Sequence, residues 1–140
     1  MKRITFSVSG VMGKQRPKAH IVKGHPVIYT PKETKAFENH VATEYMAQGG
    51  FKFDADLPLR IVIRVFQAIP KATSKAKRLK MLANDIRPTK KPDPDNIGKI
   101  VMDALNGVAY EDDRQVVEMN VTKFYGAEDQ MEVTIREVTQ

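Results

Sequence analysis

The stretch KPDPDNIGKIVMDALNGVAYEDD, Lys91 to Asp113, combines a core-facing helix pattern with an unusual density of acidic side chains. From about Asn96 onward, apolar residues recur at the i, i+3, i+4, i+7 and i+8 spacing of a helix that buries one face. These residues are Ile97, Ile100, Val101, Ala104 and Leu105. Because Asn106–Gly107 is a typical helix end, the stretch predicts a core helix from about Asn96 to Asn106.

The same stretch holds six acidic residues, and like charges held close together cost free energy unless something compensates them. Asp93 and Asp95 are two apart in an extended, Pro-flanked segment, which places both on one side of the chain. Asp95 is also positioned to cap the helix, and Lys99 and Asp103 continue its stripe at i+4 steps. Oxygen-only clusters favour Mg²⁺ or Mn²⁺, so the acids together predict a divalent-metal site.

Asp112 and Asp113 lie past the helix, and the return of the chain brings them near either its start or its end. The sequence leaves both arrangements open. A plainer alternative needs no metal at all: Asp95 is an N-cap, Asp103 pairs with Lys99, and the Asp112–Asp113 pair is a solvated turn. The strongly basic segment beside the acids favours the metal for the set as a whole.

The rest of the chain alternates between strand and helix patterns. Period-2 alternation predicts strands at 3–10, 57–67, 115–126 and 130–138. The basic segment 13–30, with two Gly and two Pro, predicts a loop leading into a short hairpin. A short cationic helix is predicted within 70–85, and an extended Pro-rich segment after it at 86–96.

A further helix is predicted to follow the hairpin. Thr30 is the expected N-cap, with Pro31 at the first helical position and Glu33 completing a capping box. Gly49–Gly50 is the expected stop. The face that repeats every four residues consists of Phe37, Val41 and Tyr45. The element order predicts one small α+β (mixed α/β) domain over 1–140, with two main helices packed on a mixed sheet of four or more strands.

The positive charge of the chain is concentrated in two segments. The net charge of +6 divides into +6 over 1–23, zero over 24–70, +7 over 71–91 and −7 over 92–140. Basic segments of this kind attract nucleic acid or an anionic membrane, or form a solvated face. The basic helix has few bulky apolar residues to insert into lipid, which disfavours the membrane.

Cysteine is absent, which excludes disulfides, zinc–thiolate sites and thiol catalysis. A chain without cysteine suits a reducing cytosol, so a cytoplasmic location is expected. No apolar stretch approaches the length needed to span a bilayer.

The segment Arg87 to Val116 resembles the hallmark segment of the RusA-type Holliday junction resolvases, which include many phage and prophage members. The pattern is Asp-x-Asp-Asn-x-x-Lys, then Asp-Ala-Leu, then a paired Asp-Asp before Gln-Val. In this chain it falls on Asp93, Asp95, Asn96, Lys99, Asp103–Leu105, Asp112–Asp113 and Gln115–Val116. The resemblance implies a homodimeric endodeoxyribonuclease that cuts four-way DNA junctions with Mg²⁺ or Mn²⁺.

The resemblance also implies roles for individual residues. The essential acids of the family, which are metal ligands, fall on Asp93, Asp95 and Asp113, with Asp112 as a further candidate. The essential lysine of the family falls on Lys99. Lys99 would bind the scissile phosphate or steady the nucleophile. Contacts to DNA backbones are expected from the basic residues Lys14, Arg16, Lys18, Lys71, Lys75, Lys77, Arg78, Lys80, Arg87, Lys90 and Lys91.

Two other functions fit the same residues. One is a nuclease that acts on flaps, loops or other branched DNA. The other is a DNA-binding module without catalysis, in which the acids are structural and no metal-dependent nicking occurs.

Overall fold

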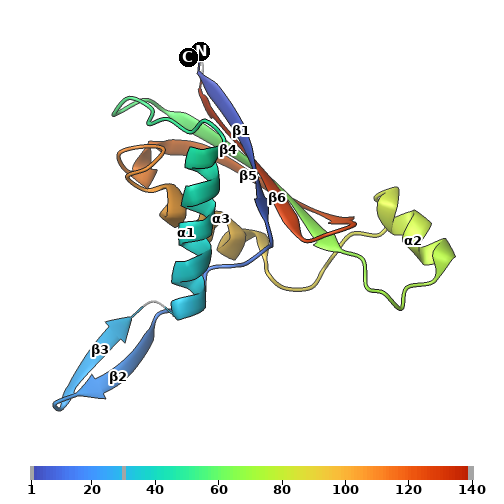
Figure 1. Ribbon diagram of the computed structural model, residues 1–140, viewed down its shortest axis with the longest axis horizontal. Coiled ribbons are helices and arrows are strands. Elements are labelled where there is room, and N and C mark those ends of the chain that lie inside the picture. The colour runs from blue at the N-terminus through green and yellow to red at the C-terminus, as the bar shows by residue number, and fades with distance from the viewer. Residues whose placement is uncertain (1, 30, 139–140) are drawn as a thin grey trace.

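The computed structural model describes residues 2–29 and 31–138 and is built around a four-stranded mixed sheet (Figure 1). The strand order is β1-β6-β4-β5, with β4 and β5 parallel and the other neighbours antiparallel. The strands are β1 (Arg3–Ser9), β4 (Leu59–Ala68), β5 (Val116–Gly126) and β6 (Gln130–Glu137), and a separate hairpin is formed by β2 (Lys18–Val22) and β3 (His25–Tyr29). The helices are α1 (Lys32–Ala47), α2 (Lys75–Leu82), α3 (Pro94–Leu105) and the short 3₁₀ helix η1 (Asp113–Gln115). The predicted α+β class with its mixed sheet and two main helices is confirmed.

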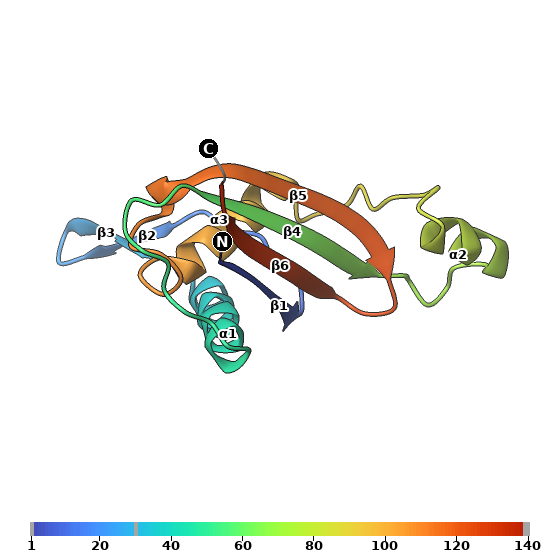
Figure 2. The same ribbon diagram turned by 90° about the horizontal axis from the view of Figure 1, so that it is seen from above.

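One face of the sheet forms the core because strand residues alternate between its two sides. Along β4 the inward residues Leu59, Ile61, Ile63 and Val65 are fully buried. Helices α1 and α3 pack together on this side (Figure 2), where α1 contacts β1 and α3 contacts β5. The apolar face predicted for α3 is confirmed, since Ile97, Ile100, Val101 and Leu105 are fully buried and Ala104 is nearly so.

The predicted starts of both main helices need correction. Helix α3 begins at Pro94, two residues before the expected Asn96, and Asp93 rather than Asp95 is its N-cap. Proline suits a first helical position because that residue's N–H has no partner inside the helix. Helix α1 begins at Lys32, and Pro31 is its N-cap rather than its first helical residue; the predicted cap Thr30, and the capping box that depends on it, lie outside the described residues. The predicted ends, before Gly49 and Gly107, are confirmed.

Two basic elements project from the body on different sides (Figure 1). The hairpin β2–β3 carries its apolar Ile21 and Ile28 at 76% and 74% exposure. The cationic helix α2, whose N-cap Ser74 accepts a hydrogen bond from the Lys77 amide, lies beyond the ends of β4 and β5. Within the described ranges, no helix is long and apolar enough to cross a membrane.

Candidate active site

The first end of α3 presents two acidic side chains to solvent. Asp93 Oδ1 accepts a hydrogen bond of 3.1 Å from the Asn96 amide, which satisfies one of the unpaired donors at the helix start. Asp95 lies in the first turn and is exposed. The positive end of the helix dipole lies beside both side chains, as is usual for acidic residues in a first turn. This end of α3 therefore offers two exposed side chains with oxygen donors.

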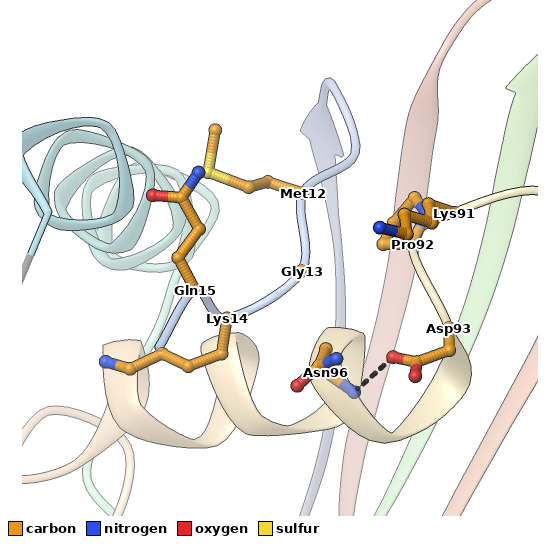
Figure 3. Close-up of a pocket in the computed structure, with 8 residues that line it drawn as sticks. All are labelled: Met12, Gly13, Lys14, Gln15, Lys91, Pro92, Asp93 and Asn96. Atoms are coloured by element: carbon orange, nitrogen blue, oxygen red, sulfur yellow. Dashed lines mark hydrogen bonds between the residues drawn. The ribbon is translucent and has the colours of Figure 1, made fainter. Parts of the chain in front are cut away.

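A loop from β1 to the hairpin runs beside this helix end (Figure 3). The Lys14 amide donates to the Asn96 carbonyl at 2.8 Å, and a Cβ on Gly13 would lie 2.8 Å from Pro92 Cβ. Only glycine permits so close an approach. The loop and the helix start enclose a cavity of about 480 Å³. Its lining consists of Met12, Gly13, Lys14, Gln15, Lys91, Pro92, Asp93 and Asn96.

Lys14 joins three elements through its side chain. Its Nζ lies 2.9 Å from Glu38 Oε2 on α1 and 3.1 Å from Asp103 Oδ2 on α3. Burial alone would lower the pKa of Lys14, but the two carboxylates outweigh that effect and raise the pKa above its usual value. The suggested pairing of Asp103 with Lys99 is therefore wrong. A contact from Lys14 to DNA would require its ammonium to leave both acids.

Lys99 occupies the exposed side of α3 between the two acidic ends. It lines a second cavity, of about 250 Å³, together with Arg16, Asn96 and Asp103. In the part of the chain that the structure describes, Lys99 has no acidic oxygen within ion-pair distance, although Asp95 and Asp103 are its i±4 neighbours. Its ammonium is thus available to an external anion beside Arg16.

The far end of α3 carries the second acidic pair, which Gln115 holds in place. The buried Gln115 accepts from the Glu111 amide at 2.9 Å, and its Nε2 donates to the carbonyls of Asp54 and Leu57 at 3.0 and 3.1 Å. Asp112 caps η1 through a 2.9 Å bond from the Arg114 amide, and this bond lowers the pKa of the Asp112 carboxyl. Asp112 thus has a structural role, whereas Asp113 contacts the Asp112 carboxyl and caps no helix.

The pKa of Asp113 is raised by partial burial and by the nearby carboxylates of Asp112 and Asp103. Beneath these acids lies the buried Tyr110, whose hydroxyl donates to the Met102 carbonyl at 2.6 Å. Burial, followed by the charges of Asp113, Asp103 and Asp112, raises the pKa of Tyr110. The structure therefore answers a question that the sequence left open: Asp112 and Asp113 return to the end of α3.

The acids form two groups rather than one. Helix α3 has 12 residues, which corresponds to a length of about 18 Å at 1.5 Å per residue. Asp93 and Asp95 lie at its start and Asp113 beyond its end, and among residues 2–29 and 31–138 no three His, Asp or Glu side chains meet as one metal-binding group. Mg²⁺ is commonly held by one or two carboxylates, with water and a substrate phosphate completing its shell. The oxygen donors at each end fit such an ion.

Two further residues beside Asp93 were not anticipated from the sequence. Gln67, 4% exposed, donates from Nε2 to the Lys91 carbonyl at 3.1 Å, and its Oε1 is buried without a partner in the described structure. Lys123 points inward from β5 and donates to the Lys90 carbonyl. Burial lowers the pKa of Lys123, Asp93 opposes the shift and Lys90 adds to it. The alternation of each strand could have indicated both residues, because Gln67 and Lys123 occupy positions whose side chains face the core side of the sheet.

The predicted DNA-binding residues lie in three places. Arg16 and Lys18 lie at the base of the hairpin, and Lys90 and Lys91 directly precede the first acids. Arg87 packs its guanidinium 4.4 Å from the Phe124 ring centroid and donates to the Lys123 carbonyl at 2.7 Å. The projecting region around α2 contains Lys71, Lys75, Lys77, Arg78 and Lys80. The cationic surface is therefore divided around α3.

The sequence was also compared with those of known proteins. It is 38% identical to the uncharacterized protein YqaN of Bacillus subtilis (strain 168) over 142 residues, which cover 99% of each chain. Residues 10–136 match the family described as Endodeoxyribonuclease RusA, and this range includes both ends of α3 and both basic projections. The chain therefore belongs to the RusA endodeoxyribonuclease family.

Proposed function

We propose that this protein resolves four-way DNA junctions by metal-dependent hydrolysis of two phosphodiester bonds. The observation that carries the proposal is the family match over residues 10–136, which includes every acid from Asp93 to Asp113. The arrangement of charge supports it, because exposed carboxylates at the start of α3 lie directly after a cationic segment. Such a segment attracts the polyanion on which the acids would act.

We propose Mg²⁺ or Mn²⁺ as the cofactor, with Asp93 and Asp95 as ligands of one ion at the start of α3 and Asp113 as a ligand of a second ion at its far end. Asp93 Oδ1 is engaged by the Asn96 amide, so Oδ2 is the atom we assign to the ion. When bound, the metal would supply Lewis acidity and a water of lowered pKa. Asp112 is a weaker candidate because its Oδ1 already caps η1.

The protein's own residues would bind and orient the DNA. We assign Lys99 Nζ to the scissile phosphate, because its ammonium is exposed and has no acidic partner in the described structure. Arg16 lies beside it in the same cavity and would hold a neighbouring phosphate. The Lys14–Glu38–Asp103 group would keep the loop that carries Arg16 against α3. Basic residues on the α2 projection would hold more distant backbone positions.

The active species that we propose is a homodimer with two-fold symmetry. A four-way junction has approximate two-fold symmetry and needs two strands cut, and a symmetric dimer presents equivalent sites related by that operator. Light scattering at working concentration should give twice the mass of the chain. A dimer of one wild-type and one Asp113→Asn protomer should nick a junction without releasing paired duplexes. Full resolution by this mixed dimer in one binding event would refute the symmetric scheme.

The decisive experiment uses purified protein and an end-labelled synthetic four-way junction in Mg²⁺, Mn²⁺ or EDTA. We expect paired cuts in either metal and intact DNA in EDTA. Flaps, bubbles and linear duplex serve as comparison substrates. Faster cutting of a flap would assign the protein to branched DNA more generally, and binding without cutting in any metal would leave only a DNA-binding module.

A further inference from the structure

The face of the sheet opposite α1 and α3 is open along most of β4 and β5 in the described structure (Figure 2), and α2 contacts β5 near the strand end. Its β4 residues are the even-numbered ones, which are half-buried or exposed while their odd-numbered neighbours are buried. Two phenylalanines, Phe66 on β4 and Phe124 on β5, are directly paired in the sheet register on this face. Neither belongs to the hydrophobic core. Both rings are half-buried, so part of each ring remains accessible to a ligand.

The two rings form a stacked pair that arginines flank. Their centroids are 5.5 Å apart with an interplanar angle of 23°. The Arg64 guanidinium carbon lies 5.4 Å from each centroid, and that of Arg87 lies 4.4 Å from Phe124. Arg64 is 49% exposed, and its ion pair with Glu132 is long, at 3.4 Å. The group therefore combines flat apolar surface with cations that are accessible to solvent.

A cavity of about 140 Å³ lies at the edge of this group, between Phe66 and the β5–β6 turn. It is several times larger than the roughly 30 Å³ that one water molecule occupies in the liquid. Gly126 contributes to the space, because a Cβ at that position would lie 3.2 Å from Phe66 Cβ. The lining residues are Phe66, Gly126, Ala127, Glu128 and Gln130.

The chain connects this face directly to the candidate active site. Strand β5 is an edge strand, and Arg87 packs on its outer face while Lys90 contacts Lys123 on its inner side. Three residues after Lys90 the same segment reaches Asp93, which is close enough to Lys123 for its charge to act on the pKa of that lysine. The six residue steps from Arg87 to Asp93 span at most about 20 Å. Arg87, Lys90 and Lys91 thus provide positive charge along a path around the open edge.

We propose that Phe66 and Phe124, with Arg64 and Arg87, form a stacking platform for an unpaired DNA base near the branch point. Aromatic rings on an open sheet stack bases without sequence preference, and adjacent arginines bind the backbone. The net positive charge of these groups and their continuity with the cationic segment favour DNA as the occupant. The proposal rests on the proposed nuclease function and adds a substrate feature to it: unpaired nucleotides within reach of the cut.

The first test compares a Phe66→Leu/Phe124→Leu variant with wild type in EDTA. Equilibrium binding is measured on a junction with two unpaired nucleotides at its centre and on linear duplex of equal length. We expect a loss of about 5-fold to 140-fold for the unpaired substrate, equivalent to about 1–3 kcal/mol per stacked base. Duplex binding should be unchanged. Phe51→Leu, the same change at a partly buried ring outside the platform, is the matched control.

The second test does not depend on the variant folding. 5-Iodouracil at the unpaired positions is irradiated in complex with the wild-type chain, and crosslinked peptides are mapped by mass spectrometry. Crosslinks to Phe66 or Phe124 support the platform. Crosslinks confined to the hairpin or α2, or equal losses of affinity for unpaired and duplex DNA, overturn it. Asp93→Asn should keep the crosslink and lose cutting, so a failed platform is distinguishable from a failed nuclease assignment.

Discussion

The two ends of helix α3 carry similar acids in very different surroundings. At the start, Asp93 and Asp95 are exposed, close to the helix N-terminus and preceded by cations. At the far end, Asp103 forms an ion pair with Lys14. Asp112 caps η1, and its amide donates a hydrogen bond to the buried Gln115 side chain. Identical side chains thus have different energetic roles. The first group lies at the positive end of the helix dipole and remains open to a ligand, whereas much of the second group supports the fold.

The largest difference between the two ends should appear in catalysis. We expect Asp93→Asn or Asp95→Asn to lower the cutting rate at least about 100-fold, because loss of a direct metal ligand exceeds the 10–100-fold typical of supporting residues. Junction binding in EDTA should persist, since the basic surface is unchanged. Asp56→Asn, an exposed acid outside α3, is the control. Normal nicking by both variants in Mg²⁺ would exclude the first end as the metal site.

A variant of Lys99, which lies between the two ends of α3, tests whether this side chain takes part in DNA cutting or is only a surface charge. We expect Lys99→Ala to reduce the single-turnover rate roughly 10-fold or more while changing the free energy of unfolding little. A surface i+4 pair would be worth only about 0.3–0.5 kcal/mol, and its loss would leave turnover nearly intact. Lys35→Ala on α1 provides the matched removal of an exposed helical lysine. Equal single-turnover cutting rates for Lys99→Ala and Lys35→Ala would mean that Lys99 has no role in the reaction.

Lys14 tests the structural role assigned to the second end. Lys14→Met leaves Glu38 and Asp103 without their shared cation, so we expect the free energy of unfolding to fall by about 1–3 kcal/mol. Chemical denaturation measures the loss. Adding Asp103→Asn to Lys14→Met should recover part of it, because one unpaired charge is removed. Strictly additive effects in this double-mutant cycle would mean that the two side chains do not interact in solution.

The smallest expected effect is the pH dependence from Asp113. Its pKa is raised in the folded protein, so the folded state holds this proton more tightly than the unfolded chain does. Stability should therefore fall as pH rises from the ordinary value of 3.8 through the raised pKa. The Asp113→Asn variant lacks this loss and should gain stability relative to wild type across that window. Denaturation in EDTA between pH 3.5 and 6 measures the difference, and a constant difference would contradict the raised pKa.

Much of the fold was predictable from local patterns. The inward face of β4 and the buried stripe of α3 follow from periods of 2 and 3.6, which depend only on backbone geometry. Glycines at 49 and 107 marked helix ends for the same local reason. The sequence pattern predicts the start of α3 two residues late, because the prolines around Asp93 favour extended chain, whereas in the structure Asp93 is an N-cap followed by a first helical proline.

The sequence by itself determined the fold class, the inventory of acids and bases along α3, and the family resemblance. These depend on residue order and spacing over short distances. Only the tertiary structure decided that Asp113 returns to the end of α3, that Lys14 serves Asp103, and that Phe66 and Phe124 share an open sheet face. Each of these pairings joins residues that are distant in the chain or meet across a strand register. The packing of the whole core selects such contacts, and local sequence patterns do not encode them.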